Sequence, residues 1–214
     1  MDLKYIKEKL KGMQTVERSN LALLLGDNRR TVDYRIKILQ KNDIITPLKN
    51  GFYYINQNYE NSVNKEFLNI YFANLIQPNS YISLEYALAY YNLIPEKIVS
   101  YTFVTTTKTK QLNTPLGFFR YRKIKPELYF GYKQIFYEGF FYNLAEPYKA
   151  VFDFLYFLPY YKDFYKNNLQ ENLRINWYAL PELERIKLYD LIDKTKSKKL
   201  QKYKKIIQNI YVKG

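Results

Sequence analysis

Two closely spaced helices near the start of the sequence constrain the fold of this chain most strongly. The segment TVERSNLALLLG (15–26) predicts a helix that ends at Gly26, because glycine readily takes the left-handed conformation of a helix end. The segment RRTVDYRIKILQKN (29–42) predicts a second helix, and either Asp27 or Asn28 can cap its start. Two helices joined by so short a turn are typical of a helix-turn-helix.

A hairpin is predicted directly after the second helix. Asn50-Gly51 lies between the apolar runs IITPL and FYYI, and Asn-Gly at such a place is a strong hairpin signal because these turns need positive φ. Together with a short helix at 2–11, the pattern predicts a winged helix-turn-helix at residues 1–57. In such a domain the second helix would enter the major groove of DNA, and the hairpin would be the wing.

The second helix has one apolar and one polar face. Val32, Ile36 and Leu39 recur at i, i+4 and i+7 and predict a buried stripe. At the start of the helix, a phosphate near Arg29-Arg30 would contact both the arginine cations and the free N–H groups of the first turn. We expect Arg30, Tyr34 and Lys37 to read base edges. Arg29, Lys49 and Asn50 should hold phosphates and set the register. The full set of predicted DNA-binding residues is Arg29, Arg30, Thr31, Tyr34, Lys37, Lys49 and Asn50. Modules of the same shape also bind only protein, so this alternative stays open.

Positive charge is concentrated at the C-terminal end. The net charge is +14, and residues 185–214 carry 10 basic and 2 acidic groups, a net charge of +8. Such a concentration attracts polyanions, although a solvated basic helix without a ligand would have the same composition. The candidate polyanion-binding tail comprises Lys198, Lys199, Lys202, Lys204 and Lys205.

The missing residue types argue against an enzyme. The chain has neither cysteine nor histidine, so Ser–His and Cys–His nucleophile pairs are excluded and the commonest metal ligands are lacking. No Asp-x-Asp pair or P-loop pattern is present, and Asp190 and Asp193 lie on a lysine-rich helix where ion pairing explains them. We therefore expect no catalytic residues, no metal and no cofactor. The absence of a signal peptide and of a long apolar run predicts a cytoplasmic protein without a membrane partner.

Residues 58–214 predict a larger mixed α/β domain, so the expected fold class is α+β. Its sheet should be small and mostly antiparallel, with strands at 100–106, 116–124, 129–132 and within 133–144, and a polar loop at 108–114. Helices are expected at 63–76, at 84–93 behind a Ser83 cap, at 147–157 behind Glu146-Pro147, within 173–193 and at 196–212. Asp153 would lie inside the core helix, where a buried carboxylate needs a partner, and a neighbouring backbone group is the simplest one.

The order of these segments resembles the AbiEi-type antitoxins, the transcription-regulating partners in abortive-infection (type IV) toxin–antitoxin systems. The resemblance covers nearly the whole chain, and its most specific parts are PNSYISLEYALAYYNLIPE (78–96) and LAEPYKAVFDFLYF (144–157). The sequence departs from the family pattern at Tyr86, where a small residue is expected. The resemblance implies a winged domain that binds operator DNA and represses its own operon. It also implies a C-terminal domain that neutralises a neighbouring nucleotidyltransferase toxin, without implying direct binding to it.

Two other functions remain open at this point. A transcription factor whose C-terminal domain senses a ligand or dimerises would have the same sequence features. An enzyme acting on nucleic acid would need clustered carboxylates to hold magnesium, which the sequence does not offer.

Overall fold

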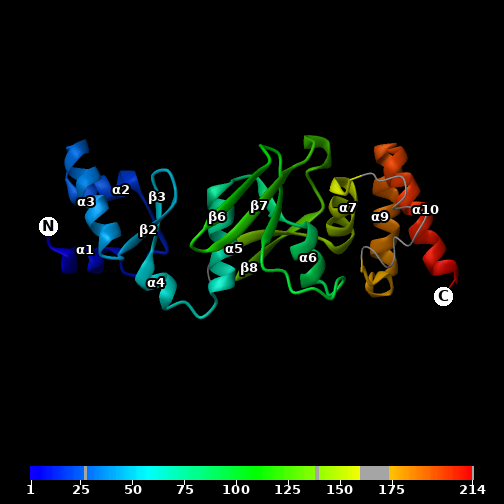
Figure 1. Ribbon diagram of the computed structural model, residues 1–214, viewed down its shortest axis with the longest axis horizontal. Coiled ribbons are helices and arrows are strands. Elements are labelled where there is room, and N and C mark those ends of the chain that lie inside the picture. The colour runs from blue at the N-terminus through cyan, green and yellow to red at the C-terminus, as the bar shows by residue number, and fades with distance from the viewer. Residues whose placement is uncertain (27, 138–139, 160–173, 214) are drawn as a thin grey trace. The chain divides into compact units, whose positions relative to one another are not determined.

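The structure, a computed structural model, describes residues 1–26, 28–137, 140–159 and 174–213 (Figure 1). By its internal packing the chain divides into two compact units, Met1–Ile76 (unit 1) and Gln77–Gly214 (unit 2). The boundary expected after residue 57 falls inside unit 1, because the helix that follows packs on the hairpin of that unit.

Unit 1 begins with a helix, a strand, two helices and a hairpin, and ends with two further helices. The elements are α1 (Leu3–Leu10), β1 (Thr15–Glu17), α2 (Arg18–Leu25), α3 (Arg29–Lys41), β2 (Ile45–Lys49), β3 (Phe52–Ile55), α4 (Asn56–Glu60) and α5 (Lys65–Ile76). The strands form an antiparallel sheet in the order β1-β3-β2. The α5 helix is held on this unit by the Phe72 ring, which stacks on Tyr54 with centroids 5.8 Å apart, and by Asn69, whose Oδ1 accepts from the Tyr59 hydroxyl at 3.0 Å.

The helix predicted at residues 15–26 begins later than expected. Thr15–Glu17 forms strand β1 and pairs with β3, and α2 starts only at Arg18. The prediction of helix from residue 15 was therefore wrong at this end. Thr15 and Val16 are β-branched and suit a strand. A segment of three residues forms a strand only when a partner strand is present, and that partner lies far along the chain.

The predicted faces of α3 are confirmed. Val32 is 1% exposed, Ile36 is 4% exposed and Leu39 is fully buried. They join a core made of the following buried residues: Ile6, Leu10, Val16, Leu21, Leu25, Ile44, Ile45 and Ile55. Every element from α1 to β3 therefore contributes to one core.

The predicted hairpin is also confirmed. Lys49 pairs with Phe52 across the Asn50-Gly51 turn, and Gly51 has φ +74°. The register shifts between Pro47 and Lys49, so a bulge adjoins the turn. Because β2 is an edge strand, Pro47 can be accommodated although it has no N–H to donate.

Unit 2 is built on a six-stranded mixed sheet in the order β6-β7-β5-β4-β9-β8. The strands are β4 (Ser80–Ile82), β5 (Tyr101–Thr105), β6 (Lys110–Thr114), β7 (Gly117–Lys123), β8 (Tyr132–Tyr137) and β9 (Phe140–Ala145). The pairs β5–β7 and β4–β9 are parallel and the other three are antiparallel. The sheet is thus larger than the expected small one, whereas most of its strand pairs are antiparallel as expected.

Three details of this sheet differ from the sequence expectation. Lys110–Thr114, within the expected polar loop at 108–114, is edge strand β6. Of Tyr129–Tyr132, expected as a strand, only Tyr132 belongs to one, namely β8, and the residues before it follow the short 3-10 helix η1 (Pro126–Leu128). The central strand Ser80–Ile82 was not expected at all. A polar edge strand lacks the apolar alternation of a half-buried strand, and a three-residue strand is too short to show any alternation.

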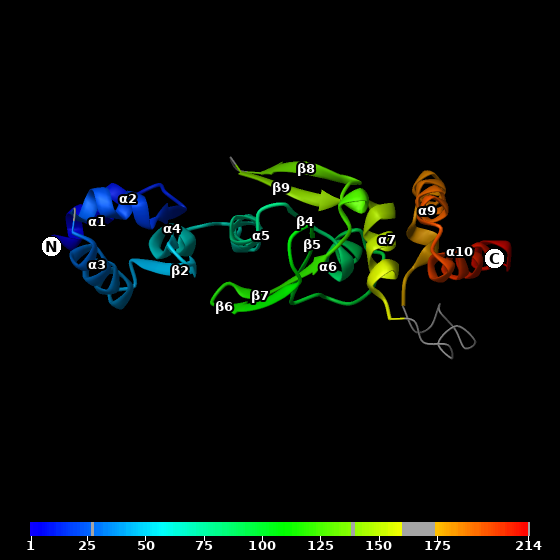
Figure 2. The same ribbon diagram turned by 90° about the horizontal axis from the view of Figure 1, so that it is seen from above.

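The first two α-helices of unit 2 lie beside this sheet, and the last two lie beyond the second of them (Figure 2). The described helices are α6 (Leu84–Tyr90), α7 (Pro147–Phe157), the 3-10 helix η3 (Trp177–Ala179), α9 (Glu182–Thr195) and α10 (Lys198–Lys213). The core helix α7 packs against α6 and α9, and Pro147 occupies its first turn as predicted. Residue 173, at the start of the expected 173–193 helices, lies outside the described residues. Among the helices of the described ranges, none is long and apolar enough to cross a membrane.

Candidate nucleic-acid interface

The start of α3 presents two arginines at the surface. Asn28 caps the helix, and its Oδ1 accepts from the Arg30 N–H at 2.9 Å. Asp27, the other candidate cap, lies outside the described residues. Arg29 and Arg30 are both exposed, and Thr31 is half-buried. The cations and the N-terminal end of the helix dipole therefore face the same region of solvent.

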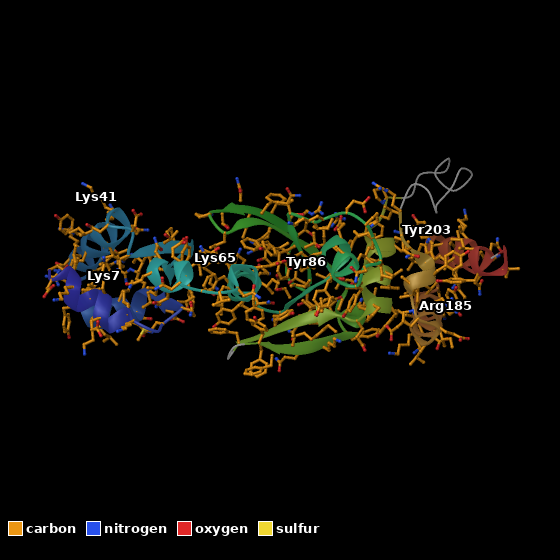
Figure 3. The ribbon with its side chains drawn as sticks, turned by 90° about the horizontal axis from the view of Figure 1, so that it is seen from below. Lys7, Lys41, Lys65, Tyr86, Arg185 and Tyr203 are labelled. Carbon is orange, nitrogen blue, oxygen red and sulfur yellow. The ribbon has the colours of Figure 1, made fainter. Side chains whose placement is uncertain are left out.

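The exposed face of α3 continues from these arginines along the whole helix. Arg30, Tyr34, Lys37 and Lys41 follow at i, i+4, i+7 and i+11 and are all exposed, and the Tyr34 side chain reaches 66%. Lys41, at the C-terminal end of this stripe, is labelled in Figure 3. A stripe of cations interrupted by an aromatic ring, opposite a fully buried face, has the form of a surface that can enter a groove in nucleic acid.

Arg35, which was not among the predicted site residues, links α3 to α2. The Arg35 guanidinium donates to the Leu25 carbonyl at the end of α2. A cation at a helix C-terminus is favoured by the dipole and satisfies an unpaired carbonyl. The sequence offered a weak sign of this role, because Arg35 lies between the apolar and exposed faces.

A second arginine joins α2, α3 and the hairpin turn. The Arg18 backbone N–H donates to the Gly51 carbonyl at 2.8 Å. Its guanidinium donates to Asp33 Oδ1 on α3, with Nε at 3.0 Å and Nη2 at 2.7 Å. Tyr53 lies near both charges. Burial raises its pKa most, while Arg18 lowers the pKa and Asp33 raises it. Neither Arg18 nor Asp33 was among the predicted site residues.

The two predicted residues of the hairpin differ in their surroundings. Asn50 is exposed at the turn. Lys49 is half-buried: its Nζ donates to the Leu75 carbonyl at 2.5 Å and lies 5.1 Å from the centroid of the Phe52 ring. The ammonium of Lys49 thus caps the C-terminal end of α5 in this structure, whereas its place next to the turn had predicted a phosphate contact.

The lysines of the candidate polyanion-binding tail fall into two groups. Lys199 donates to the carbonyls of Tyr156 and Leu158 at the end of α7, at 2.6 and 3.1 Å, and burial lowers its pKa. Lys204 forms an ion pair of 2.6 Å with Asp193. Lys198, Lys202 and Lys205 are exposed along α10. The structure therefore uses the first two in packing α10 onto its neighbours and leaves the other three at the surface.

A buried polar cluster lies at the centre of unit 2. Lys149 and Asp153, one turn apart on α7, are both 0% exposed and form an ion pair of 2.6 Å. Asp153 Oδ2 also accepts from the Tyr81 hydroxyl at 2.9 Å and the Ser83 hydroxyl at 2.8 Å. The partners of Asp153 are therefore side chains, which corrects the expectation of a backbone group. The cluster joins the two segments, 78–96 and 144–157, that carry the family resemblance.

Burial dominates the electrostatics of this cluster. Desolvation lowers the pKa of Lys149 and raises that of Asp153, while each charge opposes the shift of the other. Burial next to Asp153 also raises the pKa of Tyr81 far above its ordinary value. Lys149 lies over the Phe152 ring, 4.7 Å from its centroid. A cluster with no solvent-exposed member has no access for a substrate, and the described residues contain no group of carboxylates that could hold a metal ion.

The expected Ser83 cap of α6 is replaced by a residue from another strand. The Ser83 hydroxyl is used by Asp153, and Thr102 Oγ1 of β5 accepts from the Tyr86 N–H at 3.0 Å and donates to the Ser83 carbonyl at 2.6 Å. Leu84 between them has φ +59°, an unfavourable conformation for a branched residue. Thr102 and Asp153 thus hold a strained junction between β4 and α6 from both sides.

Unit 2 also contains a pocket of about 460 Å³ beside the end of α7. Its lining includes the apolar side chains of Leu128, Phe130 and Leu191 and the cations of Lys125 and Lys194. A volume of this order suits a small ligand.

No protein-family model and no curated protein matches this chain in sequence. The likeness to the AbiEi-type antitoxins therefore stays a prediction from the two motif segments quoted above and from the order of the predicted segments.

Proposed function

We propose that unit 1 is a winged helix-turn-helix that binds double-stranded DNA with α3 in the major groove. The observation that carries this proposal is the cationic exposed stripe of α3, opposite a fully buried face and next to a hairpin. The order of helix, strand, two helices and hairpin agrees with that class of fold. Binding only to protein would not require the arginine pair at the start of α3.

The side chains have different roles in this proposal. Arg30, Tyr34 and Lys37 face base edges, where arginine can contact guanine through two hydrogen bonds. Arg29 and Thr31 hold phosphates near the start of the helix, and Asn50 does so from the wing. Lys49 supports the wing through its bond to Leu75 instead of contacting DNA directly.

The roles can be separated with duplexes selected by the wild-type protein from a randomised library. Arg30→Ala should reduce the preference for the selected sequence over random DNA by about 1–3 kcal/mol, the value of one bidentate base contact. Lys4→Ala, which removes an exposed charge from α1, should leave that preference unchanged. Fluorescence anisotropy at fixed salt measures both affinities. Failure of the wild-type protein to select any sequence, or equal losses on both kinds of DNA, would contradict the proposal.

Within this class, we propose that the protein is an AbiEi-like antitoxin that represses its own operon and neutralises a nucleotidyltransferase toxin through unit 2. The resemblance of segments 78–96 and 144–157 supports the assignment, and both segments meet in the cluster around Asp153. The exposed lysines of α10 would add attraction for nucleic acid. The proposal requires no direct complex between antitoxin and toxin.

Co-expression with the neighbouring gene tests this assignment. That gene should stop growth when expressed alone, and the full chain should restore it. Arg30→Ala should restore growth as well while losing repression of a reporter placed behind the upstream DNA, because the two activities belong to different units. A neighbouring gene without toxicity, or toxicity that the full chain does not relieve, would overturn the assignment.

A ligand-responsive transcription factor is the second candidate, favoured by the pocket of about 460 Å³ in unit 2. In that case DNA binding would change on addition of a small molecule, and Phe130→Ala in the pocket would abolish the response. Rescue of growth from a neighbouring toxin distinguishes the antitoxin from this alternative.

A further inference from the structure

We infer that Arg18 and Asp33 are positioning residues that hold the wing in a fixed place beside the reading face of α3, and so set the sequence preference of the protein. This inference rests on the proposed DNA-binding function. Its physical basis is a single junction at which three elements meet, namely the start of α2, the exposed face of α3 and the turn between β2 and β3.

Arg18 contacts the wing through its backbone. Its N–H donates to the Gly51 carbonyl at 2.8 Å, and a side-chain carbon at position 51 would lie 3.7 Å from Arg18 Cβ. The turn therefore lies directly on the first residue of α2. Gly51 has φ +74°, a backbone conformation that most other residues would adopt only with strain, so the turn has a defined conformation.

Arg18 contacts α3 through its side chain. Both Nε and Nη2 donate to Asp33 Oδ1. The side chain of Arg18 is 35% exposed and that of Asp33 is 50% exposed. Asp33 precedes Tyr34 and lies one turn before Lys37, so the pair borders the predicted base-reading residues. A movement of Arg18 would therefore change the distance between Asn50 at the wing and Tyr34 on the helix.

The charge of Asp33 makes the inference testable. An acidic side chain beside a DNA-binding face repels phosphates, so electrostatics alone predicts that its removal tightens binding to every duplex. A positioning role predicts a different result, because the freed Arg18 no longer holds α3 and wing in register. For comparison, the Lys11–Glu8 pair at the end of α1 is 3.8 Å long, and its side chains are far more exposed than those of Arg18 and Asp33.

The experiment compares Asp33→Ala with Glu8→Ala, which removes the same charge from unit 1, on the selected duplex and on random DNA. Asp33→Ala should leave binding to random DNA equal or tighter while lowering the preference for the selected duplex by about tenfold or more, the loss expected for roughly one misread base pair. Glu8→Ala should leave the preference unchanged. Arg18→Lys keeps the charge and the backbone N–H but loses the two-donor geometry, and should also lower the preference.

The outcomes separate the inference from the proposed function. If the wild-type protein selects no sequence, the proposed function fails. If it selects one but Asp33→Ala binds selected and random DNA more tightly by the same factor, the inference alone fails. Thermal unfolding of each variant, monitored by circular dichroism, identifies a loss of the fold. If Asp33→Ala does not fold, the milder Arg18→Lys tests the inference through the same ratio of its affinities for selected and random DNA.

Discussion

We expect Asp153→Ala to remove most of the stability of unit 2. The substitution would leave the ammonium of Lys149, which is 0% exposed, without its counter-charge. Breaking a buried pair in this way costs about 3–5 kcal/mol. The hydroxyls of Tyr81 and Ser83 would also lose their acceptor, and an unsatisfied buried donor costs roughly 1–3 kcal/mol. A total of about 5 kcal/mol or more is comparable with the whole stability of a small domain.

A double variant separates the charge from the hydroxyls. Lys149→Met with Asp153→Leu removes both charges at similar volume and leaves only the two hydroxyls unsatisfied. We expect this variant to be more stable than Asp153→Ala by about 3 kcal/mol, because no isolated charge remains buried. The stability of Lys149→Met alone should lie between those of the two other variants, since Asp153 keeps its two hydroxyl donors and can take up a proton.

Trp177 provides the assay. It is the only tryptophan of the chain, it is 1% exposed, and it belongs to unit 2. Its fluorescence during urea unfolding therefore reports the stability of that unit. Glu127→Ala is the control, because Glu127 forms an exposed pair with Lys125 at 3.8 Å and such pairs contribute little. An Asp153→Ala protein as stable as this control, or a double variant less stable than Asp153→Ala, would refute the reasoning.

Two further predictions concern other parts of unit 2. Lys199→Met should lower its stability by about 1–2 kcal/mol by removing the bonds to the Tyr156 and Leu158 carbonyls, whereas Lys198→Met, next to it and exposed, should change the urea midpoint little. Stability should also fall as the pH rises above about 10, where tyrosines of the unfolded chain ionise but buried ones with raised pKa, such as Tyr81 and Tyr121, do not. Each such tyrosine should cost about 1.4 kcal/mol per pH unit, and a urea midpoint of unit 2 that stays constant between pH 10 and pH 11 would contradict this.

Local patterns in the sequence predicted several parts of the structure correctly. The buried stripe of Val32, Ile36 and Leu39, the turn at Asn50-Gly51 and the start of α7 at Pro147 all depend on residues within one or two turns of each other. The sequence also indicated that the carboxylate of Asp153 would need a partner, because that requirement follows from burial alone.

The identity of each long-range partner was decided only by the tertiary structure. Asp153 meets Tyr81 and Ser83 across some 70 residues of chain, and Lys49 and Lys199, which looked like surface cations, donate to backbone carbonyls of other helices. Strands β1 and β6 exist because a partner strand satisfies their backbone groups, although β1 has only three residues and β6 is mostly polar. The sequence by itself determines which face of an element is apolar and where the chain can turn, since neighbouring residues settle both. Which polar groups remain available for a ligand depends on what the fold brings next to them.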